Sequence, residues 1–456
     1  MRRVDLARPP LVKRLLRSRW PQLLLTLAAL AGFTFAIVTG FAGTPVGNRN
    51  FAVVFVWIAW WAALILLLVP VLGRGWCSVC PIPAPGEWLQ RGAVLGPGGR
   101  RLGLERRWPK RFRNIWLQNA GFLLLALFAA VVLTRPTVTA IVLLGILVIA
   151  TGTSLVFERR AFCRYLCPVG GFIGLYSQLA PVELRVKDTS VCASHRDKTC
   201  YTGNADGYGC PWNVYPAGLV KNINCGLCFE CVRACPYDNL AFNLRAPGAD
   251  LTEPRGRRLD EAYKAFIMLG AAVIYSAVML GPWGWLKTAA YAVGSLEWLA
   301  YVAAFLAFIL VLLPGCFLLA VRLGQALAGG ELARKAFASL AYSLVPLGLG
   351  AWIAFSVSFV FANGSYIWPA LSDPLGWGWD IAGTAGVSWS PYLTGLVPEL
   401  QAITLLGGFV WSGITTRRIA GQLLDAGQRG KDLRLATPVL VFSLAVTVLL
   451  LALLVG

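Results

Sequence analysis

Residues 137–168 read TVTAIVLLGILVIATGTSLVFERRAFCRYLCP. The first part, 137–157, is almost entirely apolar and matches the ~20 residues that a helix needs to cross a bilayer core. One acidic and two basic residues follow it, and then come Cys163 and Cys167, the second of which precedes a proline. The stretch therefore predicts a membrane helix whose basic end carries a pair of cysteines.

The rest of the chain is equally apolar. Of its 456 residues 57% are hydrophobic and 14% charged, with a mean hydropathy of +0.65, whereas soluble domains are nearer half apolar and a quarter charged. The segments long and apolar enough to span a bilayer are 21–42, 51–73, 115–134, 137–157, 263–281, 293–321, 337–362, 394–415 and 436–455. We expect an all-α polytopic membrane protein with about nine transmembrane helices and one polar insert between the fourth and the fifth.

The basic residues predict the orientation of these helices. The chain has 41 Lys and Arg against 21 Asp and Glu. If the N-terminus is cytoplasmic, the outer loops hold only Arg49, Arg135 and Lys287, and every other Lys and Arg lies inside, as positive-inside topology requires. The C-terminus is then outside, in the cytoplasmic (inner) membrane of a prokaryote. Basic residues spread over all inner loops exclude a nucleic-acid-binding module, and the long first apolar segment favours an uncleaved anchor over a signal peptide.

The strongest motif lies in the insert. Residues 225–236 read CGLCFECVRACP, which is the C-x2-C-x2-C-x3-C-P spacing of bacterial ferredoxins. Zinc is the alternative, but zinc sites usually take two separated cysteine pairs. Three thiolates of the run, Cys225, Cys228 and Cys231, are predicted to bind one 4Fe-4S cluster, while Cys235 reaches the neighbouring cluster.

A second, irregular set precedes this run and consists of Cys192, Cys200 and Cys210. By the same crossover rule Cys210 completes the first cluster, and Cys192, Cys200 and Cys235 bind the second. Two cubanes need one thiolate more than these motifs supply. The extra ligand is left open among His195, Asp197 and a cysteine from a membrane corner, and a three-iron cluster with one empty corner is a further alternative.

A second pair of cysteines resembles the first. Cys77 and Cys80, followed by Pro81, end the segment 51–73 as Cys163 and Cys167 end 137–157, so the first two helix pairs read as a duplication. These thiols are predicted either to bind a third cluster together, to act as redox-active pairs, or to lend a ligand to the insert. Cys316 is the last cysteine and a further candidate ligand.

The number of histidines and the cysteine motifs limit which haem cofactors the chain can bind. The chain contains one histidine, and no Cys-x-x-Cys-His sequence occurs, so neither a bis-histidine haem nor a covalent c-type haem is expected. The predicted domains are a basic cytoplasmic N-terminus (1–20), a four-helix membrane module with a Cys-Pro corner (21–157), a cytoplasmic ferredoxin-like iron–sulfur domain (158–262) and a five-helix membrane module (263–456).

Residues 51–245 resemble the membrane polyferredoxin family that contains NapH, the C-terminal half of NosR and the RdxA/FixG/CcoG proteins. The resemblance is carried by the two Cys-Pro corners and by the run that ends at Pro236. It implies electron transfer between quinol, iron–sulfur clusters and a respiratory partner protein or multisubunit complex. The first corner departs from the family in having two residues between its cysteines instead of three, and the five last spans have no counterpart in the motifs.

Quinone and lipid are thus expected partners, and the chain is expected to be the electron-transfer subunit of a quinone-linked oxidoreductase. Two carboxylates near predicted outer helix ends, Glu297 and Glu399, are candidates to accept a proton from quinol. The alternative without a functional role is that each carboxylate lies at a helix end that reaches water. Two other functions stay open: a membrane metal (copper) reductase or maturation factor, and a redox-coupled transporter.

Overall fold

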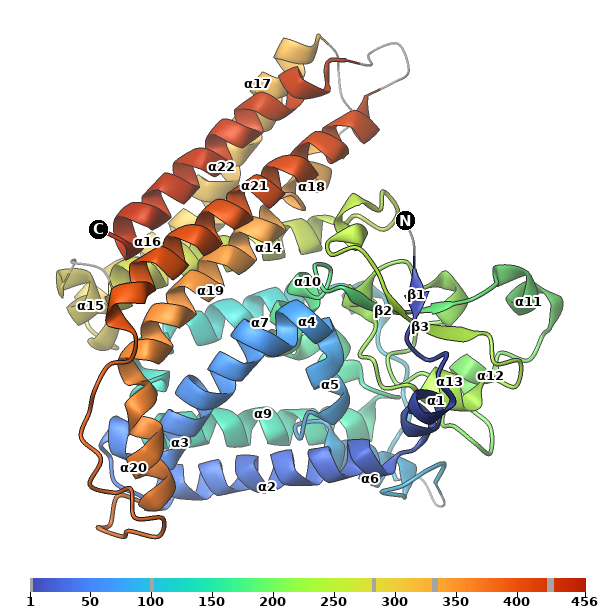
Figure 1. The fold of residues 1–456 in the computed structure, drawn as a ribbon, viewed down its shortest axis with the longest axis horizontal. Helices are drawn as coiled ribbons and strands as arrows, with labels where there is room; N and C mark the ends of the chain where they lie inside the picture. The colour runs from blue at the N-terminus through green and yellow to red at the C-terminus, as the bar shows by residue number, and fades with distance from the viewer. Residues whose placement is uncertain (1–2, 99–101, 281–283, 330–334, 425–429) are drawn as a thin grey trace. The chain divides into compact units, whose positions relative to one another are not determined.

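The computed structural model describes residues 3–98, 102–280, 284–329, 335–424 and 430–456 (Figure 1). Within these ranges seven helices are long and apolar enough to cross a bilayer: Trp20–Ala42, Phe51–Val79, Pro136–Val156, Leu259–Met279, Leu296–Ala328, Ala336–Ser372 and Asp432–Leu454. The chain is therefore a polytopic helical membrane protein, as the sequence predicts. The prediction of about nine spans compares with these seven helices in the described residues.

Two of the nine predicted segments take a different form. The segment 115–134 is divided into α7 (Trp116–Leu127) and α8 (Ala129–Val132), because the backbone of Phe128 leaves the helical region at φ −101° and ψ 8°. Twelve helical residues cover only about 18 Å. The segment 394–415 becomes α21 (Val397–Leu423), which is long but carries Arg417 and Arg418 in its later turns and is not among the seven.

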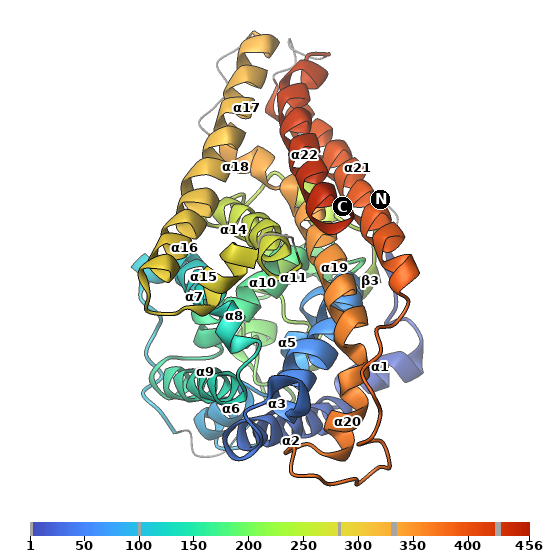
Figure 2. The same ribbon diagram turned by 90° about the vertical axis from the view of Figure 1, so that its left-hand side faces the viewer.

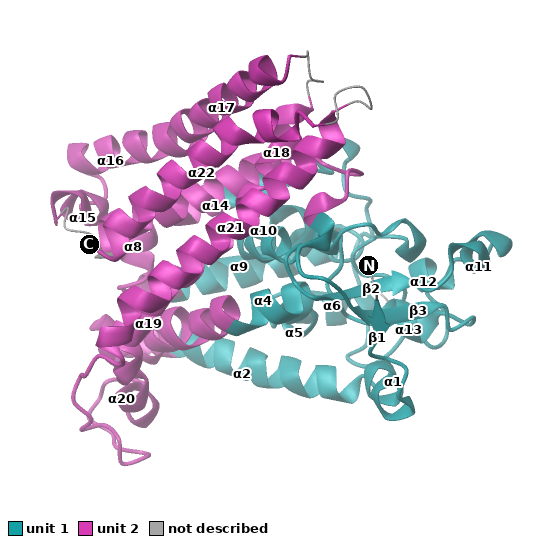
Figure 3. Cartoon of the chain, turned by 45° about the horizontal axis from the view of Figure 1, so that its top comes forward, with its two compact units in different colours: residues 1–38, 67–121, 140–250 teal, residues 39–66, 122–139, 251–456 magenta. Residues whose placement is uncertain are grey.

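The chain divides into two compact units (Figure 3). Unit 1 contains residues 1–38, 67–121 and 140–250, and unit 2 contains residues 39–66, 122–139 and 251–456. The four domains predicted from composition are continuous segments of the chain, whereas each unit combines several segments. The domain bounds stay a prediction. All motif cysteines lie in unit 1.

Unit 1 contains a small antiparallel sheet in the order β1-β3-β2. The long pair is β2 (Val182–Val186) with β3 (Leu240–Leu244), in a register that joins Val182 to Leu244, and β1 (Val4–Asp5) adds to the other edge of β3. Apolar side chains of this sheet pack with two of the cysteines, in a cluster made of Val182, Leu184, Cys200, Leu227, Cys231, Val232 and Leu240. The sheet thus supports the cysteine loops.

The basic N-terminus is docked onto this sheet and its loops. Helix α1 (Pro10–Arg17) begins with a proline at its first position, where a missing N–H costs nothing. The guanidinium of Arg233 donates to the main-chain oxygens of Arg17 and Ser18, each at 2.9 Å, and so caps the end of α1. The same side chain donates to the Cys228 oxygen at 3.0 Å. These hydrogen bonds join the N-terminus to the cysteine run.

The other helices of unit 1, some of which extend beyond it, are α2 (Trp20–Ala42), α4 (Val69–Leu72), α5 (Trp76–Val79), α6 (Ala84–Arg91), α9 (Pro136–Val156), α10 (Pro168–Tyr176), α11 (Thr189–Ser194), α12 (Thr199–Thr202) and α13 (Glu230–Ala234). Unit 2 holds α3 (Phe51–Val53), α14 (Leu259–Tyr275), α15 (Gly284–Tyr291), α16 (Leu296–Ala307), α17 (Leu313–Ala328), α18 (Ala336–Ala341), α19 (Leu344–Asn363), α20 (Ile367–Ser372) and α22 (Asp432–Leu454).

Small residues let the helices of unit 2 pack closely, as is common in membranes. A Cβ added at Gly350 on α19 would lie 2.9 Å from the Thr404 oxygen of α21, and one at Gly324 on α17 would lie 2.4 Å from the Leu435 oxygen of α22. Figure 2 shows α17 beside α22 and α19 beside α21. Side-chain hydrogen bonds add to this packing, since Gln401 donates to the Ala354 oxygen at 3.1 Å.

Candidate iron–sulfur centres

The two Cys-Pro corners have nearly the same backbone geometry. Helix α5 ends at Cys80, with φ −62° and ψ 129°, and the π-helical turn Phe162–Leu166 ends at Cys167, with φ −60° and ψ 114°. Each of these cysteines precedes a proline, which disfavours the helical region for the residue before it. The proline therefore turns the chain at the same point of both corners.

The four corner thiols lie close enough to influence one another, and we call them the corner group: Cys77, Cys80, Cys163 and Cys167. Burial, and after it the charges of the neighbouring thiolates, raise the pKa values of Cys80 and Cys163. The pKa of Cys167 rises to about 11, again chiefly through burial. None of the four forms a disulfide. The fold thus gathers four free thiols from two corners about ninety residues apart.

A buried ion pair holds the corners together. Arg160 binds both carboxylate oxygens of Glu87, at 2.6 and 2.8 Å, and donates its third hydrogen bond to the Cys77 oxygen at 2.5 Å. Burial alone would raise the pKa of Glu87, but the charge and hydrogen bonds of Arg160 outweigh it and hold that pKa below its ordinary value. Arg160 thus fixes the second corner against α6 and the first corner.

A second arginine, Arg74, lies beside the first corner and is 4% exposed. It donates to the main-chain oxygens of Cys163, at 3.4 Å, and Ile223, and its guanidinium lies 4.1 Å from the ring centroid of Trp212. Helix α10 has room for it because a Cβ at Gly174 would lie 2.9 Å from the arginine Nη1. The glycines of α10 therefore accommodate a cation.

The cysteine run of the insert forms a second group with an earlier cysteine. The pKa of Cys231 is raised by burial and then by the charges of Cys228, Cys210 and Cys225. Leu227 and Phe229, on either side of Cys228, have positive φ values of 50° and 58°, which non-glycine residues seldom adopt outside functional sites. We call this set the proximal group: Cys210, Cys225, Cys228 and Cys231.

The remaining cysteines of the insert form a smaller set. The pKa of Cys200 rises to about 11 through burial and then through the charges of Cys235 and Cys192. Thr199 donates to the Ala234 oxygen at 2.7 Å, which holds the segment of Cys200 beside that of Cys235. Asn239 donates to the Cys192 sulfur at 3.3 Å. We call Cys192, Cys200 and Cys235 the distal group.

Arginine charges connect the first two groups. The Arg160 charge acts on both Cys163 and Cys228, and the Arg74 charge acts on both Cys167 and Cys225. The proximal and distal groups are coupled directly, since the charge of Cys210 contributes to the raised pKa of Cys200. The corner group is therefore electrostatically linked to the proximal group, and the proximal group to the distal group.

The donor sets fit iron–sulfur clusters. All the cysteines are free thiols. In the described ranges no three or more His, Cys, Asp or Glu side chains lie in an arrangement that could hold a single metal ion. A cubane places each thiolate on a different iron, so its ligands stand farther apart than those of one ion. The corner and proximal groups each supply the four thiolates that a 4Fe-4S cluster takes, and the distal group supplies three.

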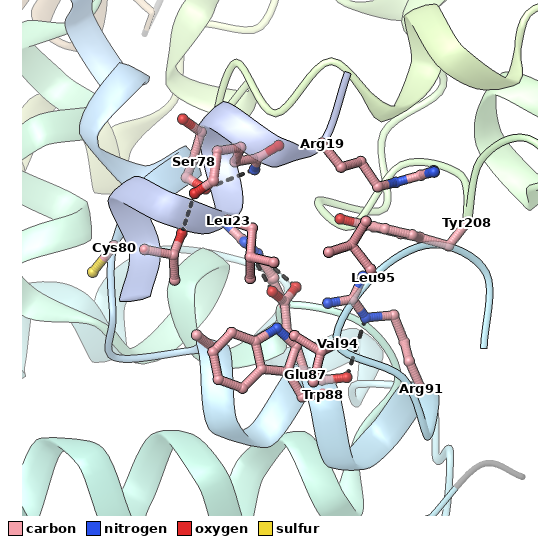
Figure 4. A pocket seen from close by; sticks show the side chains of 14 residues that line it. Arg19, Leu23, Ser78, Cys80, Glu87, Trp88, Arg91, Val94, Leu95 and Tyr208 are labelled. Atoms are coloured by element: carbon pink, nitrogen blue, oxygen red, sulfur yellow. Dashed lines mark hydrogen bonds and ion pairs between the residues drawn. The ribbon is translucent and has the colours of Figure 1, made fainter. Parts of the chain in front are cut away.

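A small pocket reaches the corner group from the side of α2 and α6. It measures about 40 Å³ and its lining includes Cys80, Trp88 and Tyr208 (Figure 4). The ring centroid of Tyr208 lies 4.1 Å from the guanidinium of Arg91 and 5.6 Å from that of Arg19. A pocket of this size has room for a few waters but not for a quinone ring.

The other predicted site residues lie apart from these groups. Glu297 and Glu399 are exposed and occupy the first turns of α16 and α21, where a carboxylate is favoured by the helix dipole. Cys316 is exposed on α17, in unit 2. Asp197 is exposed, whereas His195 is half-buried and packs against Tyr237.

The cysteine spacing does not reveal the residues that surround the thiols. Positive-inside counting treats Arg74 and Arg160 only as inner basic residues, and no motif contains Glu87 or Trp212. The available signal was position, because Arg74 lies three residues before Cys77 and Arg160 three residues before Cys163. A basic residue at the same offset from both corners is a feature of the apparent duplication.

Comparison with known proteins gives matches in the segments that contain the two Cys-Pro corners. The family model described as a 4Fe-4S binding domain matches residues 53–105 and 139–187, and each matched segment contains one corner. YccM of Escherichia coli (strain K12), which is named for electron transport, is 26% identical over 261 residues, 49% of this chain and 67% of that protein.

Two uncharacterized proteins of Methanocaldococcus jannaschii match shorter segments. MJ0750 is 30% identical over 87 residues, 19% of this chain and 32% of that protein, and MJ0749 is 28% identical over 82 residues, 18% of this chain and 30% of that protein. No solved structure matches the chain.

Fold and site together define a polytopic membrane protein with an iron–sulfur domain. The match to a 4Fe-4S binding domain and the similarity to a protein named for electron transport support a membrane-bound iron–sulfur electron-transport protein.

Proposed function

We propose that this protein relays electrons between quinol and a redox partner through three 4Fe-4S clusters, one in each cysteine group. The observation that carries the proposal is that every cysteine except Cys316 belongs to one of three sets of free thiols with mutual electrostatic influence. Such clusters, when bound, supply one-electron transfer at potentials set by charge and hydrogen bonds around the sulfurs.

The protein's own residues would set the conditions of that transfer. Arg74 and Arg160 place positive charge beside the thiolates of the corner and proximal groups. Positive charge favours the reduced, more negative form of a cluster. Because both arginines act on both groups, they would raise the two potentials together and keep electron exchange between the groups nearly balanced.

The membrane orientation is part of the proposal. We infer a cytoplasmic N-terminus and cytoplasmic cysteine groups in the inner membrane of a prokaryote, with the C-terminus outside, because Lys and Arg are concentrated in the loops on that side. The docked α1 supports this, since its Lys13 and Arg17 pair with Asp238 of the iron–sulfur region at 2.5 and 3.1 Å.

Quinol as electron donor or acceptor, a respiratory complex as partner, and Glu297 and Glu399 as proton acceptors are inferred from the resemblance and from the carboxylates at helix ends. Replacing each of the two glutamates by glutamine should slow quinol-dependent cluster reduction if it accepts the proton. Unchanged rates in both variants would remove them from the proposal.

The central experiment is anoxic purification of the full chain, with iron and sulfide analysis, electron paramagnetic resonance (EPR) and quinol titration. Three clusters predict about twelve irons per chain, and C80S, C228S and C200S should each remove the signals of one cluster. Clusters that no quinol reduces or oxidises would exclude the quinone link. Copper bound at the corner thiols in place of iron would favour the metal-reductase alternative.

A further inference from the structure

The distal group is one ligand short. It contains Cys192, Cys200 and Cys235, whereas the corner and proximal groups each contain four thiols. A cubane takes one ligand on each of its four irons. Either one iron of the distal cluster carries a ligand other than cysteine, or that iron is missing.

One side chain beside the distal group has an unused coordinating atom. His195 Nδ1 is buried and has no hydrogen-bond partner within the described part of the chain. A buried ring nitrogen without a partner is costly, so such an atom needs an explanation. Imidazole replaces cysteine as an iron ligand in some iron–sulfur centres, where it raises the reduction potential.

The fold keeps His195 on the loop that carries the distal thiols. It directly follows α11, which contains Cys192, and Lys198 donates to the main-chain oxygens of both Cys192 and His195, the latter at 2.7 Å. This closes the loop between Cys192 and Cys200. The histidine therefore has a fixed position relative to two of the three thiols.

The ring of His195 is also held against the segment of the third thiol. It stacks on Tyr237, with ring centroids 4.4 Å apart and an angle of 27° between the rings, and Tyr237 is two residues beyond Cys235. The competing carboxylate, Asp197, is exposed to solvent. Position and burial both favour the histidine.

We propose that His195 is the fourth ligand of the distal cluster, which would then be bound by Cys192, His195, Cys200 and Cys235. The inference rests on the proposed function, because it requires a cluster at the distal group. A neutral imidazole in place of a thiolate removes one negative charge, so the distal cluster should have a higher potential than the same cluster bound by four thiolates. The higher potential would make the distal cluster a better electron acceptor.

The chain offers a direct spectroscopic test because it contains only one histidine. The full chain is produced with ¹⁵N-histidine, purified anoxically through a tag that contains no histidine, and reduced. Pulsed EPR should then detect a strongly coupled histidine nitrogen on one cluster, and the coupling should change on ¹⁴N-to-¹⁵N exchange and vanish in H195A. H195C should keep the full iron content and lower the potential of the distal cluster, while the matched control D197N should leave spectra and potential unchanged.

Two results would overturn the inference, and they are distinguishable. A protein with about twelve irons per chain but without histidine coupling on any reduced cluster retains the proposed three clusters and loses the His195 ligand. A protein whose iron content and spectra are the same in wild type and C200S has no cluster at the distal group, so the proposed function fails there and the inference fails with it. H195C guards against misfolding, since the thiol restores a ligand that H195A removes.

Discussion

The buried ion pair of Glu87 and Arg160 allows a quantitative test of how the corners are held. The two side chains are 8% and 5% exposed, and the pair is bidentate. Replacing Glu87 by glutamine leaves the Arg160 charge buried without its counterion, which typically costs about 3–5 kcal/mol. For a unit of about 200 residues this corresponds to a melting temperature lower by on the order of 10 °C.

The assay is thermal unfolding of the detergent-solubilised protein, followed by circular dichroism. The matched control is R417Q, which removes an exposed ion pair with Asp432, whose side chains are 65% and 26% exposed. Such pairs contribute about 0–1 kcal/mol. The double variant E87M/R160M should recover most of the loss, because an apolar pair leaves no buried charge. If E87Q lowered the melting temperature no more than R417Q, the ion pair would not be what fixes the corners.

Three further predictions follow from the same contacts. G226A would place a Cβ 2.1 Å from Trp212 Nε1, so iron content should fall, while G218A, with nothing within 4 Å of the added Cβ, should keep it. R233Q removes the cap of α1 and should speed proteolysis near residue 18, with iron content as the control readout. Because the pKa of Glu87 is depressed, its stabilisation is complete above about pH 4.5 and is lost as the pH falls through the folded pKa; E87Q should abolish this part of the acid dependence.

The sequence was sufficient for the class of protein and for the kind of cofactor it is expected to bind. Apolar length and composition predict membrane helices because the bilayer core fixes how many residues must be apolar, and the seven such helices among the described residues confirm the polytopic fold. The spacing of the run 225–236 points to iron because thiols at every third residue suit a cubane. These features are local, so neighbouring residues carry the whole signal.

Local patterns failed where a single residue's backbone decided the outcome. The segment 115–134 is apolar throughout, yet the chain turns at Phe128 and divides it into α7 and α8. Hydropathy averages over a window and does not register such a break. The exposed positions of Glu297 and Glu399, by contrast, agree with the alternative drawn from the sequence, a helix end that reaches water.

The sequence by itself determined which thiols are proposed to bind iron and which segments can enter a membrane, because both depend on residue type and spacing. Only the tertiary structure decided the surroundings of the thiols. Arg74 and Arg160 act on cysteines up to about 150 residues away in the chain, and His195 meets Tyr237 from another loop. Charge and burial act through space, so the potential of a cluster and the identity of a missing ligand follow from contacts that no linear spacing encodes.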